Sequence, residues 1–216
     1  FSNNVNVKDL FPVETSGSTG TPFKMYKDKN TKSWANAALL RGKTWSGWEV
    51  GEKSVSLWGR HLSPSKKRKT IRHIKNFLTN SYYLSAYDMA SPKTISAYIK
   101  KINEQNPALI VGYSEALNQL SRYGLENGIE ICTPMGVYTT AEKLFPHQRK
   151  NIERFFGCSV FDYYGGAEIM GVAFECTNHK GYHITDEHVI VEVEQSDGRD
   201  KDEEYNEFII TDLDNY

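Results

Sequence analysis

Short apolar runs alternate with longer segments of helical period along most of this chain, and this alternation constrains the fold more than any other feature. Such alternation is typical of βαβ units that build a parallel sheet. We therefore predict an α/β fold with a mostly parallel sheet and flanking helices. The expected strands cover 55–58, 81–84, 109–111, 135–138 and 159–163, and the expected helices cover 31–45, 67–78, 92–104, 114–127 and 146–156.

The last expected helix carries clear signals at both ends. Pro146 suits a first helical turn, because its missing N–H has no partner there in any helix. Gly157 follows an aromatic pair and suits the left-handed stop that ends many helices. These signals predict that the helix begins at Pro146 and ends just before Gly157.

The pattern changes after Gly181 to two segments of alternating character, 189–194 and 204–211, separated by the polar stretch 196–201. This alternation predicts an antiparallel β-hairpin that adds to the main sheet. We accordingly divide the chain into an α/β core over residues 1–180 and a β-rich extension over residues 181–216.

Charge and cysteine content exclude several classes of protein. Lys and Arg total 26 and Asp and Glu total 27, so the net charge of -1 gives no general attraction to nucleic acid or anionic lipid. No apolar run approaches the roughly 20 residues that span a bilayer, and the chain does not open with a signal-peptide pattern. Cys132, Cys158 and Cys176 are too scattered for a disulfide framework, which favours the cytoplasm. We expect neither nucleic acid nor membrane as a partner, and the oligomeric state is left open.

Residues 15–22 carry the densest chemical signal of the chain. The stretch reads Thr-Ser-Gly-Ser-Thr-Gly-Thr-Pro and lies between the strand-like segments 10–13 and 23–26. Glycines allow backbone N–H groups to converge on an anion, and hydroxyl groups can donate to phosphate oxygens. It is not a Walker A loop, because no Gly-Lys-Ser or Gly-Lys-Thr follows. The stretch alone therefore does not decide between two interpretations, a phosphate-binding loop and a flexible connection.

Four motifs, in order, resemble the adenylate-forming superfamily of acyl-CoA ligases, luciferases and peptide-synthetase adenylation domains. Residues 15–22 resemble its phosphate loop, and residues 139–144 resemble the element that lines the adenine pocket. Residues 164–168, Tyr-Gly-Gly-Ala-Glu, resemble its Tyr-Gly-x-Thr-Glu element, with Ala167 in place of Thr. Residues 209–215 resemble the strand before its Arg-Tyr and Gly-Asp elements.

Further motifs resemble the phenylacetate-CoA ligase branch and its relatives with functions in capsule polysaccharide biosynthesis. The residues concerned are 141–149, 161–165, 175–176 and 181–183. One departure is Phe23, which lies between Pro22 and Lys24 where many members of the superfamily place Lys directly after Pro. The resemblance therefore leaves a phosphate contact by Lys24 open.

The resemblance implies an enzyme that uses ATP and Mg²⁺ to convert a small carboxylic acid, with an aromatic acid as one option, into an acyl-adenylate. A thiol, with coenzyme A as the expected acceptor, would then take the acyl group. By the same resemblance, the chain belongs to the N-terminal large domain, while the ribose-binding Asp and the domain with the catalytic Lys lie beyond Tyr216. We therefore expect the chain alone to be inactive. The alternative is a non-catalytic nucleotide-binding or assembly domain that keeps the fold.

The resemblance also assigns roles to individual residues. Glu168, as the Mg²⁺ ligand, and Thr19 would be the catalytic residues. For each aromatic residue in these sets, packing in the core is the alternative role. The nucleotide would be bound by Thr15, Ser16, Gly17, Ser18, Thr19, Gly20, Ala141, Glu142, Lys143, Asp162, Tyr163, Tyr164, Gly165 and Glu168, and the acid by Tyr113, Ser114, Tyr138 and Ile169.

Cys176, His179 and His183 form a Cys-x-x-His-x-x-x-His pattern. This spacing can bring three ligands to a structural Zn²⁺ ion. No fourth ligand is identifiable by spacing, so a hydrophilic loop with an incidental thiol is the open alternative.

Overall fold

The computed structural model describes residues 6–14, 23–59, 74, 76–195 and 206–215. They belong to two compact units, neither of which is continuous in sequence. The larger unit contains residues 42–163 and 175–181. The smaller unit contains residues 1–41, 164–174 and 182–216. The predicted division at Gly181 differs from these units, because the first 41 residues group with the C-terminal segment.

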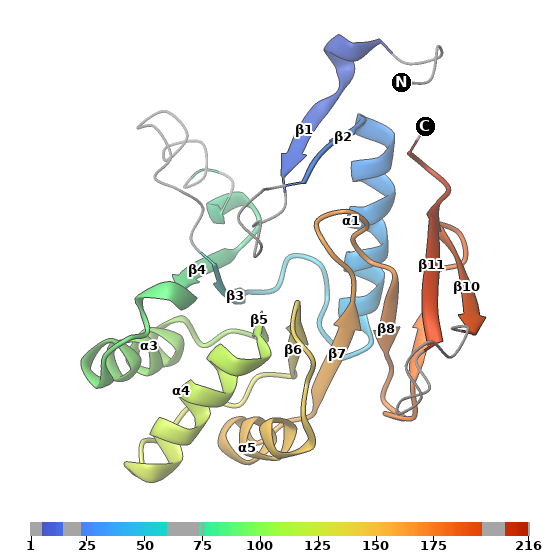
Figure 1. The fold of residues 1–216 in the computed structure, drawn as a ribbon. Coiled ribbons are helices and arrows are strands. Elements are labelled where there is room, and N and C mark those ends of the chain that lie inside the picture. The colour runs from blue at the N-terminus through green and yellow to red at the C-terminus, as the bar shows by residue number, and fades with distance from the viewer. Residues whose placement is uncertain (1–5, 15–22, 60–73, 75, 196–205, 216) are drawn as a thin grey trace. The chain divides into compact units, whose positions relative to one another are not determined.

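A parallel sheet forms the centre of the larger unit (Figure 1). Its neighbouring strands follow the order β4-β3-β5-β6-β7, and every pairing among these five is parallel. The predicted α/β fold with a mostly parallel sheet is confirmed. The strands are β3 (Ser54–Trp58), β4 (Ser81–Ser85), β5 (Leu109–Tyr113), β6 (Gly136–Thr140) and β7 (Val160–Tyr164).

The strand β6 continues two residues beyond the predicted range. Thr139 and Thr140 are buried although they are polar. The hydroxyl of Thr139 donates a hydrogen bond to the carboxylate of Asp162 at 2.7 Å, and this partner makes its burial tolerable. A polar contact of this kind between neighbouring strands cannot be predicted from the positions of apolar residues in the sequence.

Three helices lie side by side against the sheet (Figure 1): α3 (Pro92–Gln105), α4 (Ser114–Glu126) and α5 (Pro146–Phe156). The bounds of α5 confirm both end signals, since Gly157 adopts the left-handed conformation with φ 68°. The side-chain oxygen of Gln148 accepts the N–H of Phe145 at 2.9 Å and satisfies one more group at the start of this helix. Most of the expected helix 67–78 lies outside the described residues.

The core of the larger unit lies between the sheet and these helices. Apolar side chains recur every three or four residues along each helix and meet the buried side chains of the strands. The fully or nearly fully buried members are Val55, Leu57, Leu84, Met89, Ile95, Ile99, Ile102, Ile110, Leu117, Leu120, Val137, Ile152, Phe155, Phe156 and Val160. Two short 3₁₀ helices also occur, η1 (Val7–Asp9) in the smaller unit and η2 (Ala86–Asp88) in the larger unit.

The smaller unit begins with the antiparallel strands β1 (Phe11–Glu14) and β2 (Lys24–Lys27), which precede and follow residues 15–22. The helix α1 (Lys29–Thr44) comes next and ends inside the larger unit. The carboxylate of Asp28 caps this helix, because one of its oxygens accepts the N–H of Thr31 at 2.7 Å and lies 2.8 Å from the Thr31 hydroxyl oxygen. Residues 15–22 themselves lie outside the described residues.

The C-terminal hairpin consists of β10 (Val189–Gln195) and β11 (Asn206–Asp212). The antiparallel pairing is confirmed, but the expectation that the hairpin adds to the main sheet is wrong, because the two strands form a sheet of their own. The hairpin instead buries apolar side chains against Val172 and Ala173. Two strands were not predicted, β8 (Ala173–Glu175) and β9 (Tyr182–Ile184), since three residues carry too little pattern.

Candidate functional site

The order of the strands in the larger unit points to one position for a ligand. The chain passes from β3 to β4 on one side and then returns to place β5 on the other side of β3. In α/β sheets, ligands bind outside the carboxyl ends of the strands at such a reversal. Gly59, which follows β3, and Tyr113, which ends β5, lie at this point.

An aromatic cluster of Trp58, Tyr87 and Tyr113 surrounds the backbone of Gly59. The ring centroids of Trp58 and Tyr113 are 4.7 Å apart. A Cβ atom at Gly59 would lie 2.7 Å from the hydroxyl oxygen of Tyr113 and 3.2 Å from the ring of Tyr87, so a larger residue here would displace the ends of these two side chains. Of these residues the sequence predicted Tyr113 alone. The other two come from segments without a motif, and the fold brings them together.

The electrostatics of Tyr113 favour its neutral phenol. Burial raises the pKa of this hydroxyl, and the neighbouring Tyr87 and Glu142 act in the same direction, while a hydrogen bond with the Gly59 backbone opposes them. At neutral pH the phenol of Tyr113 is uncharged, and the cluster offers flat rings together with the hydroxyl groups of Tyr87 and Tyr113. This surface suits a planar or apolar group, with the hydroxyls as polar contacts.

The predicted residues Ser114 and Glu142 lie together at the N-terminus of α4. The carboxylate of Glu142 accepts the backbone N–H of Glu115 at 3.0 Å, and the Ser114 hydroxyl donates to the carbonyl oxygen of Glu142 at 3.3 Å. An anion is favoured at a helix N-terminus, so Glu142 stabilises α4. The preceding residue Ala141 has φ 67°, a left-handed conformation that costs a non-glycine residue about 1 kcal/mol. Lys143 is exposed, with its amine 5.5 Å from the centroid of the Phe145 ring.

Two further predicted residues, Tyr138 and Asp162, are buried. Tyr138 is fully buried, its hydroxyl donates to the carbonyl oxygen of Gly42, and its ring stacks on Phe161 at 5.2 Å. Its contacts are therefore those of a core residue, and its role in binding the acid stays a prediction. Asp162 accepts the hydroxyl of Thr139. Tyr163 follows it in β7, and burial raises the pKa of Tyr163.

A buried ion pair joins α5 to the segment after β7. One guanidinium nitrogen of Arg149 lies 2.8 Å from each carboxylate oxygen of Glu175, whose side chain is 8% exposed. The same carboxylate accepts the backbone N–H of Asp162 at 3.0 Å. Sequence reasoning assigned neither residue a role, although both lie in the motifs of the phenylacetate-CoA ligase branch. The pair holds the backbone at a predicted nucleotide-binding residue.

The residues of the predicted zinc site have different surroundings. The imidazole of His179 lies 3.5 Å from the Glu175 carboxylate and packs on Phe161. Cys176 and His179 belong to the larger unit, while His183 belongs to the smaller one. Within the described residues, these three are not among the side chains whose ligand atoms gather closely enough for one metal ion. The zinc site stays a prediction.

The predicted residues Tyr164, Gly165, Glu168 and Ile169 form a tight turn in the smaller unit. The N–H of residue 166 donates to the carbonyl oxygen of Ile169 at 2.8 Å. A Cβ atom at Gly165 would lie 2.9 Å from the backbone nitrogen of residue 171, so this close approach requires glycine. Tyr164 is 55% exposed, and Glu168 is exposed at the tip of the turn. Ile169 packs against the small core around Val172.

Lys27 is a buried cation near this turn, and sequence reasoning did not single it out. Its side chain lies at the end of β2 and is almost fully buried. Burial lowers the pKa of the amine, whereas the carboxylates of Asp212 and Glu168 raise it. The smaller unit thus places a lysine and the exposed Glu168 in electrostatic contact just after the segment 15–22.

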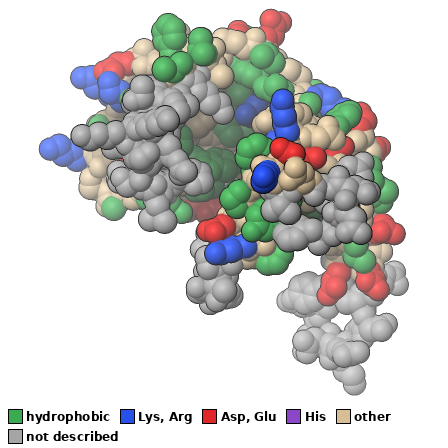
Figure 2. Space-filling model, turned by 90° about the horizontal axis from the view of Figure 1, so that it is seen from above, with side chains coloured by type: hydrophobic (Ala, Val, Ile, Leu, Met, Phe, Trp, Pro, Cys, Tyr) green, Lys and Arg blue, Asp and Glu red, His purple; other side chains and the backbone are tan. Residues whose placement is uncertain are grey.

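The surface of the protein carries charges of both signs. On the face shown in Figure 2, Lys and Arg side chains lie interspersed with Asp and Glu side chains and with hydrophobic ones. This agrees with the near-zero net charge. Among the helices that the structure describes, none has the length and apolar character needed to cross a membrane.

Comparisons with known proteins agree on one fold. No protein-family model matches the chain. The chain is 34% identical over 173 residues to Protein CapK of Staphylococcus aureus, and this match covers 80% of the chain and 38% of CapK. The chain thus spans about two fifths of the length of the curated relative that it matches.

Solved structures of AMP-forming ligases superimpose on most of the chain. A 2-hydroxyisobutyryl-CoA ligase, solved with 2-HIB-AMP and CoA, matches 88% of the chain and 41% of its own, with a TM-score of 0.64 and 15% identity. VinN matches 89% of the chain and 47% of its own, with a TM-score of 0.62 and 17% identity. A long-chain-fatty-acid-CoA ligase, FadD1, of Archaeoglobus fulgidus matches 94% of the chain and 42% of its own, with a TM-score of 0.63 and 12% identity.

These matches, found independently of the motifs, test the resemblance that the sequence predicts. The identities to the solved structures are low, so those structures speak for the fold, while CapK is similar in sequence as well. The chain has the α/β fold of the AMP-forming acyl-CoA ligases, which confirms its predicted resemblance to the adenylate-forming superfamily.

Proposed function

We propose that this chain is the nucleotide-binding part of an enzyme that adenylates a carboxylic acid and transfers the acyl group to a thiol, with coenzyme A as the acceptor and the cytoplasm as its location. The observation that carries the proposal is the aromatic cluster at the strand reversal, because an α/β sheet binds its ligand there. The similarity to ligases of known structure supports the same reaction class.

Different side chains would bind the adenine, the phosphates and the Mg²⁺ ion. The exposed ring of Tyr164 provides a stacking surface for adenine, and the backbone and hydroxyl groups of residues 15–22 provide donors for phosphate oxygens. Glu168 is an exposed carboxylate of the kind that holds Mg²⁺ together with phosphate oxygens. When bound, Mg²⁺ would neutralise phosphate charge. The carboxylate of Glu168 acts electrostatically on Lys27, whose pKa it raises against the effect of burial.

The acid would bind at the aromatic cluster. Trp58 and Tyr113 present ring faces, and the neutral hydroxyl of Tyr113 can donate one hydrogen bond. The absence of a side chain at Gly59 leaves room for the tyrosine side chains beside it. An aromatic or other planar acid fits this surface better than a strongly charged one.

A second candidate function is a nucleotide-binding or assembly domain without catalysis. The observation that favours it is the coverage of the comparisons, since the chain spans only 38% of CapK and 41% of the 2-hydroxyisobutyryl-CoA ligase. The catalytic candidate and the nucleotide-binding form of the second candidate both require nucleotide binding, whereas an assembly domain does not. They differ in whether the whole protein forms an acyl-adenylate.

Calorimetric titration of ATP with Mg²⁺ into the chain tests the shared requirement. We expect weak but measurable binding, and we expect the double substitution S18A/T19A to weaken it at least about tenfold, or about 1.4 kcal/mol, because two phosphate donors are lost. Tyr164→Ala should reduce the affinity less, by about 1 kcal/mol, through the loss of stacking.

Ser33→Ala is the matched control, because Ser33 is an exposed serine on α1 whose hydroxyl only bonds to the carbonyl of Lys29. It should bind ATP as the unmodified chain does. Equal heats for the unmodified chain and S18A/T19A would count against the phosphate loop, and therefore against the catalytic candidate and the nucleotide-binding form of the second, and would leave the assembly domain.

A further inference from the structure

Three side chains with metal-binding atoms meet at the open end of the C-terminal hairpin, where β10 begins and β11 ends. His188 precedes β10, Asp212 ends β11 and Asp214 lies two residues beyond it. Antiparallel pairing sets Val189 opposite Asp212, and the N–H of residue 213 donates to the carbonyl oxygen of His188 at 3.0 Å. The backbone register thus brings the three residues together, all within the smaller unit.

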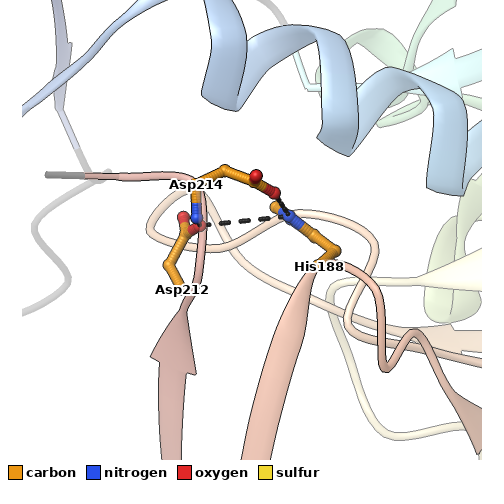
Figure 3. Close-up of side chains that lie close together, drawn as sticks. All are labelled: His188, Asp212 and Asp214. Atoms are coloured by element: carbon orange, nitrogen blue, oxygen red, sulfur yellow. Dashed lines mark hydrogen bonds and ion pairs between the residues drawn. The ribbon is translucent and has the colours of Figure 1, made fainter.

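The side chains of this group face one another (Figure 3). The Nδ1 atom of His188 lies 2.7 Å from Oδ2 of Asp214 and 3.9 Å from Oδ1 of Asp212. One ligand atom from each residue can be chosen so that all three lie within 4.8 Å of one another. The side chains of His188, Asp212 and Asp214 are only 1%, 9% and 11% exposed. Water therefore has little access to the group.

The side chains of His188 and Asp212 and the backbone of Asp214 are each held in place by a neighbour. The Nε2 atom of His188 lies 3.1 Å from the carbonyl oxygen of Met170, which can only accept, so Nε2 carries the hydrogen and Nδ1 faces the carboxylates. Metal-binding histidines are commonly oriented in this way. The backbone N–H of Asp214 donates to Oδ1 of Asp212 at 3.0 Å, and the Thr31 hydroxyl donates to the Asp214 carbonyl oxygen at 2.7 Å.

One atom of the group lacks a partner. Oδ2 of Asp212 is buried and accepts no hydrogen bond from any residue that the structure describes. A buried carboxylate oxygen without a partner is uncommon in folded proteins, because the lost hydration is not replaced. This atom is an independent sign that a positively charged ligand belongs at the site.

We propose that His188, Asp212 and Asp214 bind a divalent metal ion. One imidazole nitrogen and two carboxylate oxygens form a donor set that suits Zn²⁺ and also accepts Mn²⁺. The ion would fasten the start of β10 to the end of β11 and, through Thr31, to the first turn of α1. Neither the proposed Mg²⁺ ligand nor the predicted zinc ligands take part, so the site is independent of the proposed function.

The competing arrangement is a closed ion pair in which Nδ1 of His188 also carries a hydrogen and donates to Asp214. Lys27 would then complete the charge balance, because it acts electrostatically on Asp212. The two arrangements share the short contact between His188 and Asp214. They differ in whether the stripped protein takes up a metal ion, and this difference decides between them.

The test is a titration of the chelator-stripped chain with Co²⁺, whose visible absorption reports its ligands, and with Zn²⁺ by calorimetry. We expect one equivalent to bind at the site, with no thiolate-to-cobalt band from it in the near ultraviolet, since it holds no cysteine. Asp212→Asn and Asp214→Asn should each weaken the affinity of the site for the metal ion by about 100-fold or more. Each substitution removes the negative charge of a ligand and leaves the shape of the side chain nearly unchanged. Cys176→Ser is the control and should leave this binding unchanged.

Several results would overturn the proposal. No metal uptake by the stripped chain would establish the closed ion pair. Uptake that only produces a thiolate band, and that is lost in Cys176→Ser, would assign the metal to the predicted zinc residues. If both asparagine variants fail to fold, the absorption spectrum of the unmodified chain decides, because a nitrogen and oxygen ligand set supports the proposal and a sulfur ligand contradicts it.

Discussion

At the scale of single residues, burial controls chemistry more than residue type does, and Cys158 is the clearest case. It follows Gly157 at the end of α5 and packs against the core of the larger unit. Burial raises the pKa of its thiol to about 12, and the nearby carboxylate of Glu153 acts in the same direction. The thiolate is the charged and reactive form, so both effects suppress the reactivity of this cysteine.

We therefore predict that iodoacetamide alkylates Cys158 very slowly in the folded protein. A pKa of about 12 against an ordinary value of 9.0 lowers the thiolate fraction at neutral pH about 1000-fold. Mass spectrometry over time should show a rate that keeps rising with pH up to at least pH 10. In guanidinium chloride all three cysteines should react at similar rates, and rapid labelling of Cys158 in the folded protein at neutral pH would contradict the assignment.

Motif reasoning named some residues that the fold brings together and assigned no role to others. It named Ser114 and Glu142, which meet at the N-terminus of α4. It assigned no role to Arg149, whose partner Glu175 lies in a strand that was not predicted. A contact of that kind depends on how β8 and α5 pack, and a single sequence contains no pattern for it.

At the scale of elements, the packing of α4 on α5 depends on one glycine. A Cβ atom at Gly124 would lie 2.1 Å from the ring of Phe155, which is 8% exposed. A glycine in the middle of a helix normally weakens it by about 1 kcal/mol relative to alanine. Here the close approach of the two helices accounts for its presence.

Gly124→Ala should therefore destabilise the protein by about 1–2 kcal/mol, because overpacking costs more than the improved helix propensity returns. Urea unfolding should show a lower midpoint with an unchanged m value. In a Phe155→Leu background, where the ring is absent, the same change should be neutral or stabilising. Equal destabilisation in both backgrounds would show that Phe155 is not the cause.

The elements themselves were largely predictable, for physical reasons. Parallel strands buried on both faces appear as apolar runs, and end signals such as Pro146 and Gly157 act within a few residues. The strands β8 and β9 were missed, because three residues are too few for any period. The pairing of the C-terminal hairpin followed from alternation, but its separation from the main sheet depends on tertiary packing against Val172.

At the scale of the whole molecule, the chain corresponds to only part of each protein that it resembles. The chain matches 38% of CapK and between 41% and 47% of the ligases described above. Catalysis of adenylation requires several groups to be positioned at once. Under the proposed function, this chain would contribute nucleotide and acid contacts, and groups that it does not contain would complete the reaction.

This inference predicts that the chain alone does not exchange labelled pyrophosphate into ATP with any carboxylic acid, even where calorimetry detects ATP binding. A longer protein that includes the chain should show exchange that depends on the acid, with planar acids favoured by the aromatic cluster. Exchange by the chain alone would show that it already holds the complete catalytic set. Exchange by neither would favour the non-catalytic domain.

The discontinuity of the two units has a consequence for how the protein is made. The chain passes from one unit to the other at four places, after residues 41, 163, 174 and 181. During synthesis, residues 1–41 leave the ribosome well before the segments 164–174 and 182–216 that complete their unit. Residues 42–163 can begin to form their parallel sheet in the meantime. The smaller unit must therefore assemble last, although it contains residues 1–41.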